Sequence, residues 1–356
     1  MFTLTLSPGK CRTVVVSDPE ILRKIFAGEG KVFPLHDAAL THYVDVISAL
    51  TAKEVRRWPL GEPFALYPRL KALSLEVILR VIVGIAAGRR RARLRTLLSE
   101  MLAVDSLTLL CGAYPSLRGL ARYRRFEALM NATDALLYAE IADRRAERGL
   151  SDRHDILSRM LADNPAATDV DLRDQLVTLF LAGYDSTGTA VAWALYEIAR
   201  RPSVLKAAQK ASDDGDNAYL AAVFHESIRL HPVFPPTART LTTAVDVGGR
   251  WLPAGTPVLA AIGVAHSDPG IYHLPKEFRP ERFLGRQPSQ TPFGGGARHC
   301  LGAHFAQAAA VVVLREILRR FGLRPGSWRP ERARTHTITL PPHRGALVLL
   351  APRSAR

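Results

Sequence analysis

The sequence has few cysteines and no long apolar run, and each shortage excludes a class of protein. The three cysteines, Cys11, Cys111 and Cys300, are far apart, so they form neither a disulfide framework nor a zinc-binding pattern. This usage predicts a reducing, cytoplasmic compartment. No apolar stretch reaches the roughly 18 residues of a transmembrane helix. The first residues also lack the basic and apolar regions of a signal peptide, so we expect no membrane span and no secretion.

Positive charge is abundant, with a formal net charge of +15. Such a charge can attract nucleic acid, anionic lipid or an acidic protein. The densest basic run, Arg89 to Arg95, contains no aromatic residue that could stack on a base. We interpret it as a surface that faces water and expect no nucleic-acid partner.

Hydrophobic residues make up 47% of the 356 residues, which is typical of a folded globular protein. Helical periodicity dominates from about residue 40 to residue 230, and one helix over residues 171–200 would span roughly 45 Å. Another helix is expected over residues 301–321. Short strands are expected at residues 2–6, 13–17, 244–248, 256–260 and within 335–350. The pattern predicts one mainly α domain over residues 1–356, with small β-sheets.

A glycine-rich loop, residues 293–302, carries Cys300 where the final helix begins. Glycines allow the backbone to approach a flat ligand, and amide N–H groups at a helix start favour a thiolate. A thiolate on haem iron donates electron density that favours cleavage of the O–O bond. A lone cysteine is more often a small buried hydrophobe. A phosphate-binding loop is excluded because no Gly-Lys-Ser/Thr follows.

The middle of the long helix contains Ala182, Gly183, Asp185 and Ser186. Glycine inside a helix costs up to about 1 kcal/mol, so close approach of a cofactor or another helix should compensate for it. A carboxylate beside a hydroxyl can relay protons. Taken alone, a packing glycine with local hydrogen bonds explains the segment as well. The Gly-x-x-Ser spacing is not that of a hydrolase elbow.

A third pattern is Glu226 and Arg229, which lie on one helix face. Such pairs are common on surfaces, where they contribute little. His225-Glu226 does not begin a zinc-protease motif, because the second histidine is missing.

Together these patterns resemble the cytochrome P-450 family. The match to its haem-ligand loop consists of Phe293, Gly296, Arg298, Cys300 and Gly302. Glu226-x-x-Arg229 is similar to the K-helix pair, and residues 280–283 are similar to the meander motif, whose Arg282 would complete a triad. Ala182-Gly183-x-Asp185 is similar to the oxygen-activating turn of the I helix.

The resemblance implies a triangular prism of helices around haem b, with a long central I helix. Cys300 would be the axial iron ligand, and Asp185 and Ser186 would deliver protons. Arg239 and Arg298 would bind the haem propionates. Phe293, Gly296, Gly302, Ala182 and Gly183 would line the cofactor. The protein would then be a monomeric monooxygenase that acts on a small apolar substrate.

The resemblance also implies a ferredoxin and its reductase as electron donors, since no flavin or iron–sulfur module is expected in the chain. Basic residues that could dock the acidic ferredoxin are Arg282, Arg286, Arg315, Arg319 and Arg320.

Two departures from the family pattern matter. Ser186 stands where the family usually has threonine, so the stiffening β-branch is lost. The chain is also short before residue 41, and the B′–C region, which covers haem and shapes the substrate pocket, is reduced or missing. An alternative function is therefore a haem-binding protein of this type without oxygenase activity.

Overall fold

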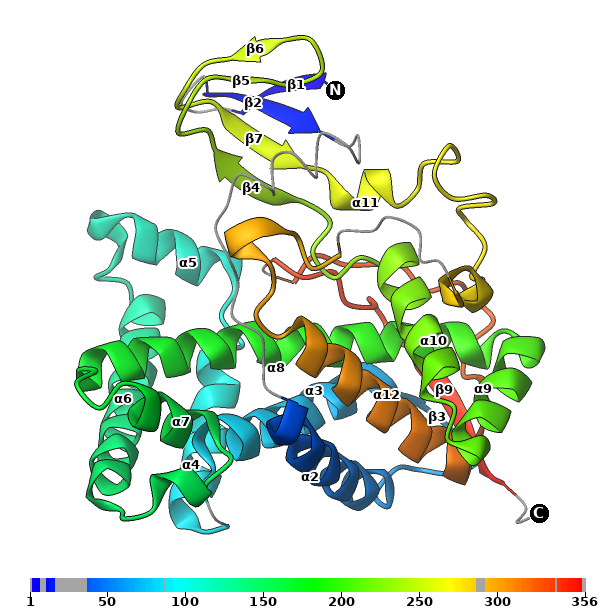
Figure 1. Ribbon diagram of the computed structural model, residues 1–356, viewed down its shortest axis with the longest axis horizontal. Helices are drawn as coiled ribbons and strands as arrows, with labels where there is room; N and C mark the ends of the chain where they lie inside the picture. Colours follow the sequence, from blue (N-terminus) through cyan, green and yellow to red (C-terminus); the bar gives the residue numbers. More distant parts are fainter. Residues whose placement is uncertain are drawn as a thin grey trace.

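The computed structural model describes residues 2–6, 11–16, 37–85, 87–285, 292–336 and 338–353. The sequence also predicts a short helix over residues 19–25, because proline favours the first turn of a helix. These residues and Arg286 lie outside the described ranges. Within them the chain is mainly helical, and the small sheets lie at the edges of the helical body (Figure 1). The predicted fold class, mainly α with small β-sheets, is therefore confirmed.

Eight helices of the described chain are longer than ten residues. They are α2 (Asp37–Val55), α3 (Leu66–Ile78), α4 (Arg89–Met101), α6 (Ala121–Ala146), α8 (Asp169–Ala199), α9 (Pro202–Asp214), α10 (Asn217–Leu230) and α12 (Ala303–Arg320). Shorter helices and turns are η1 (Leu79–Val83), α5 (Ser106–Ala113), η2 (Pro115–Leu117), η3 (Leu150–Asp152), α7 (Ile156–Asp163), α11 (Ile262–Ala265), η4 (Pro280–Phe283) and η5 (Gly296–Arg298).

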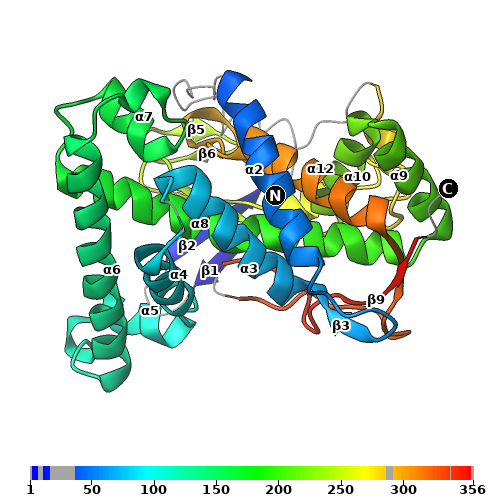
Figure 2. The ribbon, with the colours of Figure 1, turned by 90° about the horizontal axis from the view of Figure 1, so that it is seen from below.

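The long helix α8 has 31 residues and agrees closely with its predicted range. Thr168 caps its first turn: the hydroxyl accepts a hydrogen bond from the Asp171 N–H at 3.1 Å and donates to the Asp171 carboxylate at 2.6 Å. At the other end Pro202, which cannot donate a backbone hydrogen bond, starts α9 instead. The helix crosses the whole helical body (Figures 1 and 2).

The strands form three sheets. The largest has the order β1 (Phe2–Leu6), β2 (Cys11–Val16), β7 (Pro257–Ala260) and β4 (Thr237–Thr240), so the start of the chain pairs with a segment that follows α10. A second sheet has the order β3 (Pro63–Ala65), β9 (Leu347–Pro352) and β8 (Phe321–Pro325). The hairpin β5 (Val245–Asp246) and β6 (Trp251–Leu252) forms the third.

The main core surrounds the second half of α8, where every residue from Gly188 to Ala199 is buried. This half packs against α3, α10 and α12. The first half of α8 contributes Leu172, Leu176 and Phe180 to a second core with α4, α6 and α7. Each such side chain stabilises the fold by about 1.5–3 kcal/mol when fully buried. The two cores meet near the middle of α8, the segment that carries Gly183 and Asp185.

No helix in the described part of the chain combines the length and the apolar character needed to cross a membrane.

Candidate active site

The loop before α12 is held by its own backbone. The Cys300 N–H donates to the Phe293 carbonyl at 2.9 Å, and the His299 N–H donates to the Gly296 carbonyl at 3.0 Å. Gly294 and Gly296 have φ values of 70° and 64°, a region that favours glycine. The Phe293 ring packs against the main core. The loop is therefore a fixed turn that ends at α12.

Cys300 lies at the exposed end of this turn. Partial burial of the thiol away from water raises its pKa above the ordinary value. A hydrogen bond from the backbone of Gly302 acts in the opposite direction and lowers it. The predicted effect of the backbone amides is therefore present, but burial outweighs it and the net pKa of the thiol is raised. A bound metal ion reverses this relation, because a coordinating thiol is deprotonated.

The start of α12 and the middle of α8 lie side by side. Gly183 of α8 and Phe305 of α12 line the same cavity of about 30 Å³, which has room for about one water molecule. Figure 1 shows α12 crossing α8 at this point. The Cys300 turn is thus brought close to the helix segment that contains Gly183 and Asp185.

This region has the features that a flat apolar cofactor requires. Leu181 and Leu301 are 56% and 57% exposed, although both are large apolar side chains. Apart from Gly302 itself and the residues next to it in the chain, no atom of the described residues lies within 4 Å of the position that a Cβ on Gly302 would take. An exposed cysteine followed by the uncovered Leu301 and an open glycine fits haem, which would hide the apolar surface.

Asp185 and Ser186 are adjacent in sequence but have different partners. The Ser186 hydroxyl donates to the Ala182 carbonyl one turn earlier at 2.6 Å. The Asp185 carboxylate is buried, accepts hydrogen bonds from the hydroxyls of Tyr67 and Thr339, and lies 3.2 Å from the Lys71 ammonium. The proton relay between the two neighbours therefore stays a prediction.

Helix packing accounts for Gly183. A Cβ at this position would lie 3.0 Å from the Cδ1 of Ile78 at the end of α3. The alternative explanation, a packing glycine, is therefore sufficient for the glycine itself. The neighbouring Ala182 is exposed and stays available to a cofactor.

The two arginines expected at the haem propionates lie on different elements. Arg239 is half-buried in β4, and its guanidinium donates to the Ala238 carbonyl at 2.9 Å. Arg298 is exposed in η5, two residues before Cys300. Their role toward the propionates stays a prediction.

Glu226, Arg229 and Arg282 meet as predicted. Arg229 binds both oxygens of the fully buried Glu226 at 2.6 and 2.9 Å, and Arg282 lies 3.1 Å from one of them. Arg229 also donates to the carbonyls of residues 266, 275 and 277, at 2.9, 2.8 and 3.1 Å. The triad therefore fixes the irregular chain that leads toward the Cys300 turn.

Sequence reasoning missed the groups around Asp185. Tyr67 and Lys71 both lie on α3, and Thr339 lies near the C-terminal end of the chain. The i, i+4 spacing of Tyr67 and Lys71 places both side chains on one face of α3, which is a signal that they face one neighbour. The identity of that neighbour required the fold.

Known proteins with similar sequences support a haem-binding site in this chain. Residues 43–349 match the family model described as cytochrome P-450. The proteins named cytochrome P-450 135B1 and 135A1 of Mycobacterium tuberculosis are 37% and 38% identical over 396 residues. These matches cover 98% and 99% of this chain, and 84% and 88% of the relatives. Cytochrome P-450 138 of Mycobacterium bovis is 30% identical over 384 residues, which cover 96% of this chain and 87% of that protein.

The length of these matches shows that the relatives have residues that this chain lacks. The 396 aligned positions exceed the 356 residues of the chain, so at least 40 positions of the relative have no counterpart here. This number agrees with the predicted shortening. Its place in the B′–C region is a prediction from the motif order.

Proposed function

The chain belongs to the cytochrome P-450 family of monooxygenases, and on that premise we propose that it inserts one atom of dioxygen into a small apolar organic substrate. The observation that carries the proposal is the exposed sulfur of Cys300, held by a rigid turn beside the middle of α8. When bound, haem supplies the redox chemistry that activates dioxygen.

The residues assigned to haem are those of the loop and the helix segment. In this proposal Cys300 would hold the haem iron through its sulfur, and Arg298 and Arg239 would bind the propionates. Phe293, Gly296, Gly302, Ala182 and Gly183 line the cofactor. We assign haem b, because covalent attachment of haem uses a Cys-x-x-Cys-His motif that the sequence does not contain.

We assign the delivery of protons to two residues in the middle of α8, Ser186 and Asp185. Ser186 is half-buried on the side of α8 that carries the exposed Ala182, so its hydroxyl is placed to orient a proton donor. Asp185 supplies the acid from the opposite, buried side. The two groups act from different faces of one helix turn.

The proposed electron donor is a separate ferredoxin with its reductase. Of the predicted docking residues, Arg282 is committed to Glu226 and to the carbonyls of residues 273 and 274. Arg319 and Arg320 are exposed but lie at the far end of α12, about 24 Å from its first residue. Arg315 also lies on α12, about 18 Å from its first residue and therefore closer to the Cys300 turn. We propose that the acidic partner docks on that side of the protein.

A haem-binding protein without oxygenase activity is the second candidate. It is favoured by the 40 or more positions of the relative that are absent here, since a reduced cover would leave the substrate badly oriented.

The test is product formation under isotope-labelled dioxygen with a ferredoxin, its reductase and a panel of apolar compounds. We expect one labelled oxygen atom in the product, and no product from Cys300→Ser. Haem-loaded protein that forms no product, even with artificial electron donors, would favour the second candidate. Efficient turnover with hydrogen peroxide alone would instead indicate a peroxygenase.

A further inference from the structure

The carboxylate of Asp185 is surrounded by groups from distant parts of the chain. Tyr67 and Lys71 reach it from α3, and Thr339 reaches it from the segment before β9. The Lys71 ammonium lies 3.2 Å from one carboxylate oxygen and 4.6 Å from the centre of the Tyr184 ring. Two hydroxyl donors and one cation therefore hold this buried carboxylate in place.

The close approach of α3 makes this arrangement possible. A Cβ on Gly188, three residues after Asp185, would lie 3.1 Å from the backbone nitrogen of Lys71 and 3.2 Å from the Leu70 carbonyl. Glycine at this position lets the two helix backbones nearly touch, so the Lys71 side chain reaches Asp185 within its length. The cluster is thus built into the packing of α8.

His336 is the fourth group that faces this carboxylate. Its Nδ1 lies 3.8 Å from the Asp185 Oδ2, which is longer than a hydrogen bond but short enough that a small movement of either side chain would form one. The His336 side chain is 41% exposed, compared with 14% for Lys71. Histidine also changes its charge near neutral pH. Among the described groups at Asp185, His336 is therefore both in contact with solvent and able to take up and release a proton near neutral pH.

Three charged groups act on His336. Burial lowers its pKa below the ordinary value; Lys71 on α3 and Arg334 on its own segment lower it further, while Asp185 on α8 raises it. The imidazole is therefore mostly neutral near pH 7 and takes up a proton only transiently, as a shuttle requires.

This inference rests on the proposed monooxygenase function. We propose that His336 passes protons from solvent to Asp185, and that Lys71, Tyr67 and Thr339 are positioning residues that keep the carboxylate beside it. In the transfer the N–H bond of the imidazolium breaks and an O–H bond forms on Asp185. The neutral imidazole then takes a proton from a hydronium ion of the solvent, which becomes water.

The first test requires no catalysis. The His336 signal in nitrogen NMR spectra of labelled full-length protein is assigned by its loss in His336→Gln and is then titrated. We expect Lys71→Met to raise the pKa of His336, because a repelling cation is removed. Asp185→Asn should lower it, because the attracting carboxylate is lost. Identical titration curves in the three proteins would overturn the proposed coupling.

The second test uses the haem-loaded protein with its electron donors. At equal haem content, His336→Gln should lower the rate of product formation at least about tenfold and should flatten its dependence on pH. His343→Gln is the matched control, since His343 is exposed on the same segment, and it should leave both unchanged. An unaltered rate and pH profile in His336→Gln would contradict the proton route.

The two proposals fail in different ways. If the titrations show coupling but the wild-type protein forms no product, the monooxygenase proposal fails and the coupling remains as a structural property. If the wild type forms product and His336→Gln matches it, only the proton route fails.

Discussion

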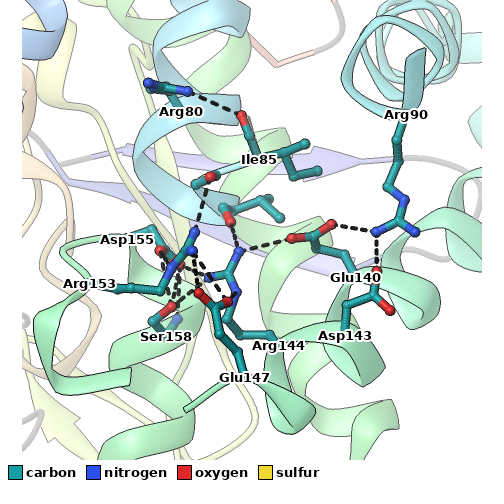
Figure 3. A network of polar contacts seen from close by, with 12 residues as sticks. Arg80, Ile85, Arg90, Glu140, Asp143, Arg144, Glu147, Arg153, Asp155 and Ser158 are labelled. Carbon is teal, nitrogen blue, oxygen red and sulfur yellow. Dashed lines mark hydrogen bonds and ion pairs between the residues drawn. The ribbon is translucent and has the colours of Figure 1, made fainter. Parts of the chain in front are cut away.

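Two arginines, Arg144 and Arg229, are almost fully buried, at 2% and 1% exposure, but their surroundings differ. Arg144 on α6 is surrounded by the carboxylates of Glu140, Glu147 and Asp155 (Figure 3). Arg229 on α10 has one carboxylate, Glu226, which it shares with Arg282.

The Arg144 network connects helices. Its guanidinium donates to the Asp155 carboxylate and the Ser158 hydroxyl at the start of α7, both at 2.5 Å (Figure 3). It also donates to the Val83 carbonyl at the end of η1 at 2.8 Å. Asp155 in turn caps α7 by accepting the Ser158 N–H at 3.0 Å. The network fixes how regular elements meet.

The Arg229 network fixes irregular chain instead. Arg229 and Arg282 together donate to five backbone carbonyls between residues 266 and 277. This stretch has little secondary structure to hold its shape, and it precedes the Cys300 turn. The comparison indicates that one buried arginine stabilises the helical body, while the other shapes the cofactor side.

The largest expected effect is that of Arg229→Met. It leaves Glu226 buried with a weaker partner, and breaking a buried ion pair costs about 3–5 kcal/mol. We expect this loss in the free energy of unfolding, measured with a chemical denaturant, together with loss of bound haem. Full haem content in the soluble variant would contradict the role of this network at the cofactor side.

Arg144→Met should cost a similar 3–5 kcal/mol, because Asp155 and Glu140 lose their shared cation. The protein that remains folded should bind haem normally, which separates the two networks. The measurement is haem absorbance per folded protein, with folding followed by circular dichroism. If Arg144→Met loses as much haem as Arg229→Met, the two networks do not have separate roles.

Acid should destabilise the region around Arg229, where His266 is buried. Burial, together with the charge of Arg229, lowers the pKa of His266 to about 4 from 6.5. Between these values the unfolded chain binds a proton that the folded protein does not, so stability falls as pH drops from about 6.5 to 4, by up to about 3 kcal/mol. Denaturation midpoints across this range should show the loss, and His266→Leu should reduce it. If the free energy of unfolding falls equally with pH in the wild type and in His266→Leu, His266 is not the cause of the loss.

The smallest effect is expected at the rim of the Arg144 network. Arg90 is partly exposed and pairs with Glu140 at 2.9 Å and with Asp143 (Figure 3). Arg90→Gln should therefore cost at most about 1 kcal/mol, measured by the same denaturation. A loss as large as that of Arg144→Met would show that the whole network, rather than its buried centre, holds the helices.

The elements and the motif residues were predictable because they depend on local patterns. The ends of α8 follow from Thr168 and Pro202, and the contact between Glu226 and Arg229 follows from helical spacing. Contacts between distant segments were not predictable. Tyr67 and Thr339 lie 118 and 154 positions from Asp185, and no local pattern relates them. Arg144 and Arg145 are neighbours in sequence, yet only Arg144 is buried.

The most direct measurement of the central assignment is the carbon monoxide difference spectrum of the reduced protein. The wild type should show the band of thiolate-ligated haem, and Cys300→Ser should lose it. Cys111→Ser, which alters a buried thiol away from the turn, should keep the band. Survival of the band in Cys300→Ser would contradict the assignment of Cys300 as the iron ligand.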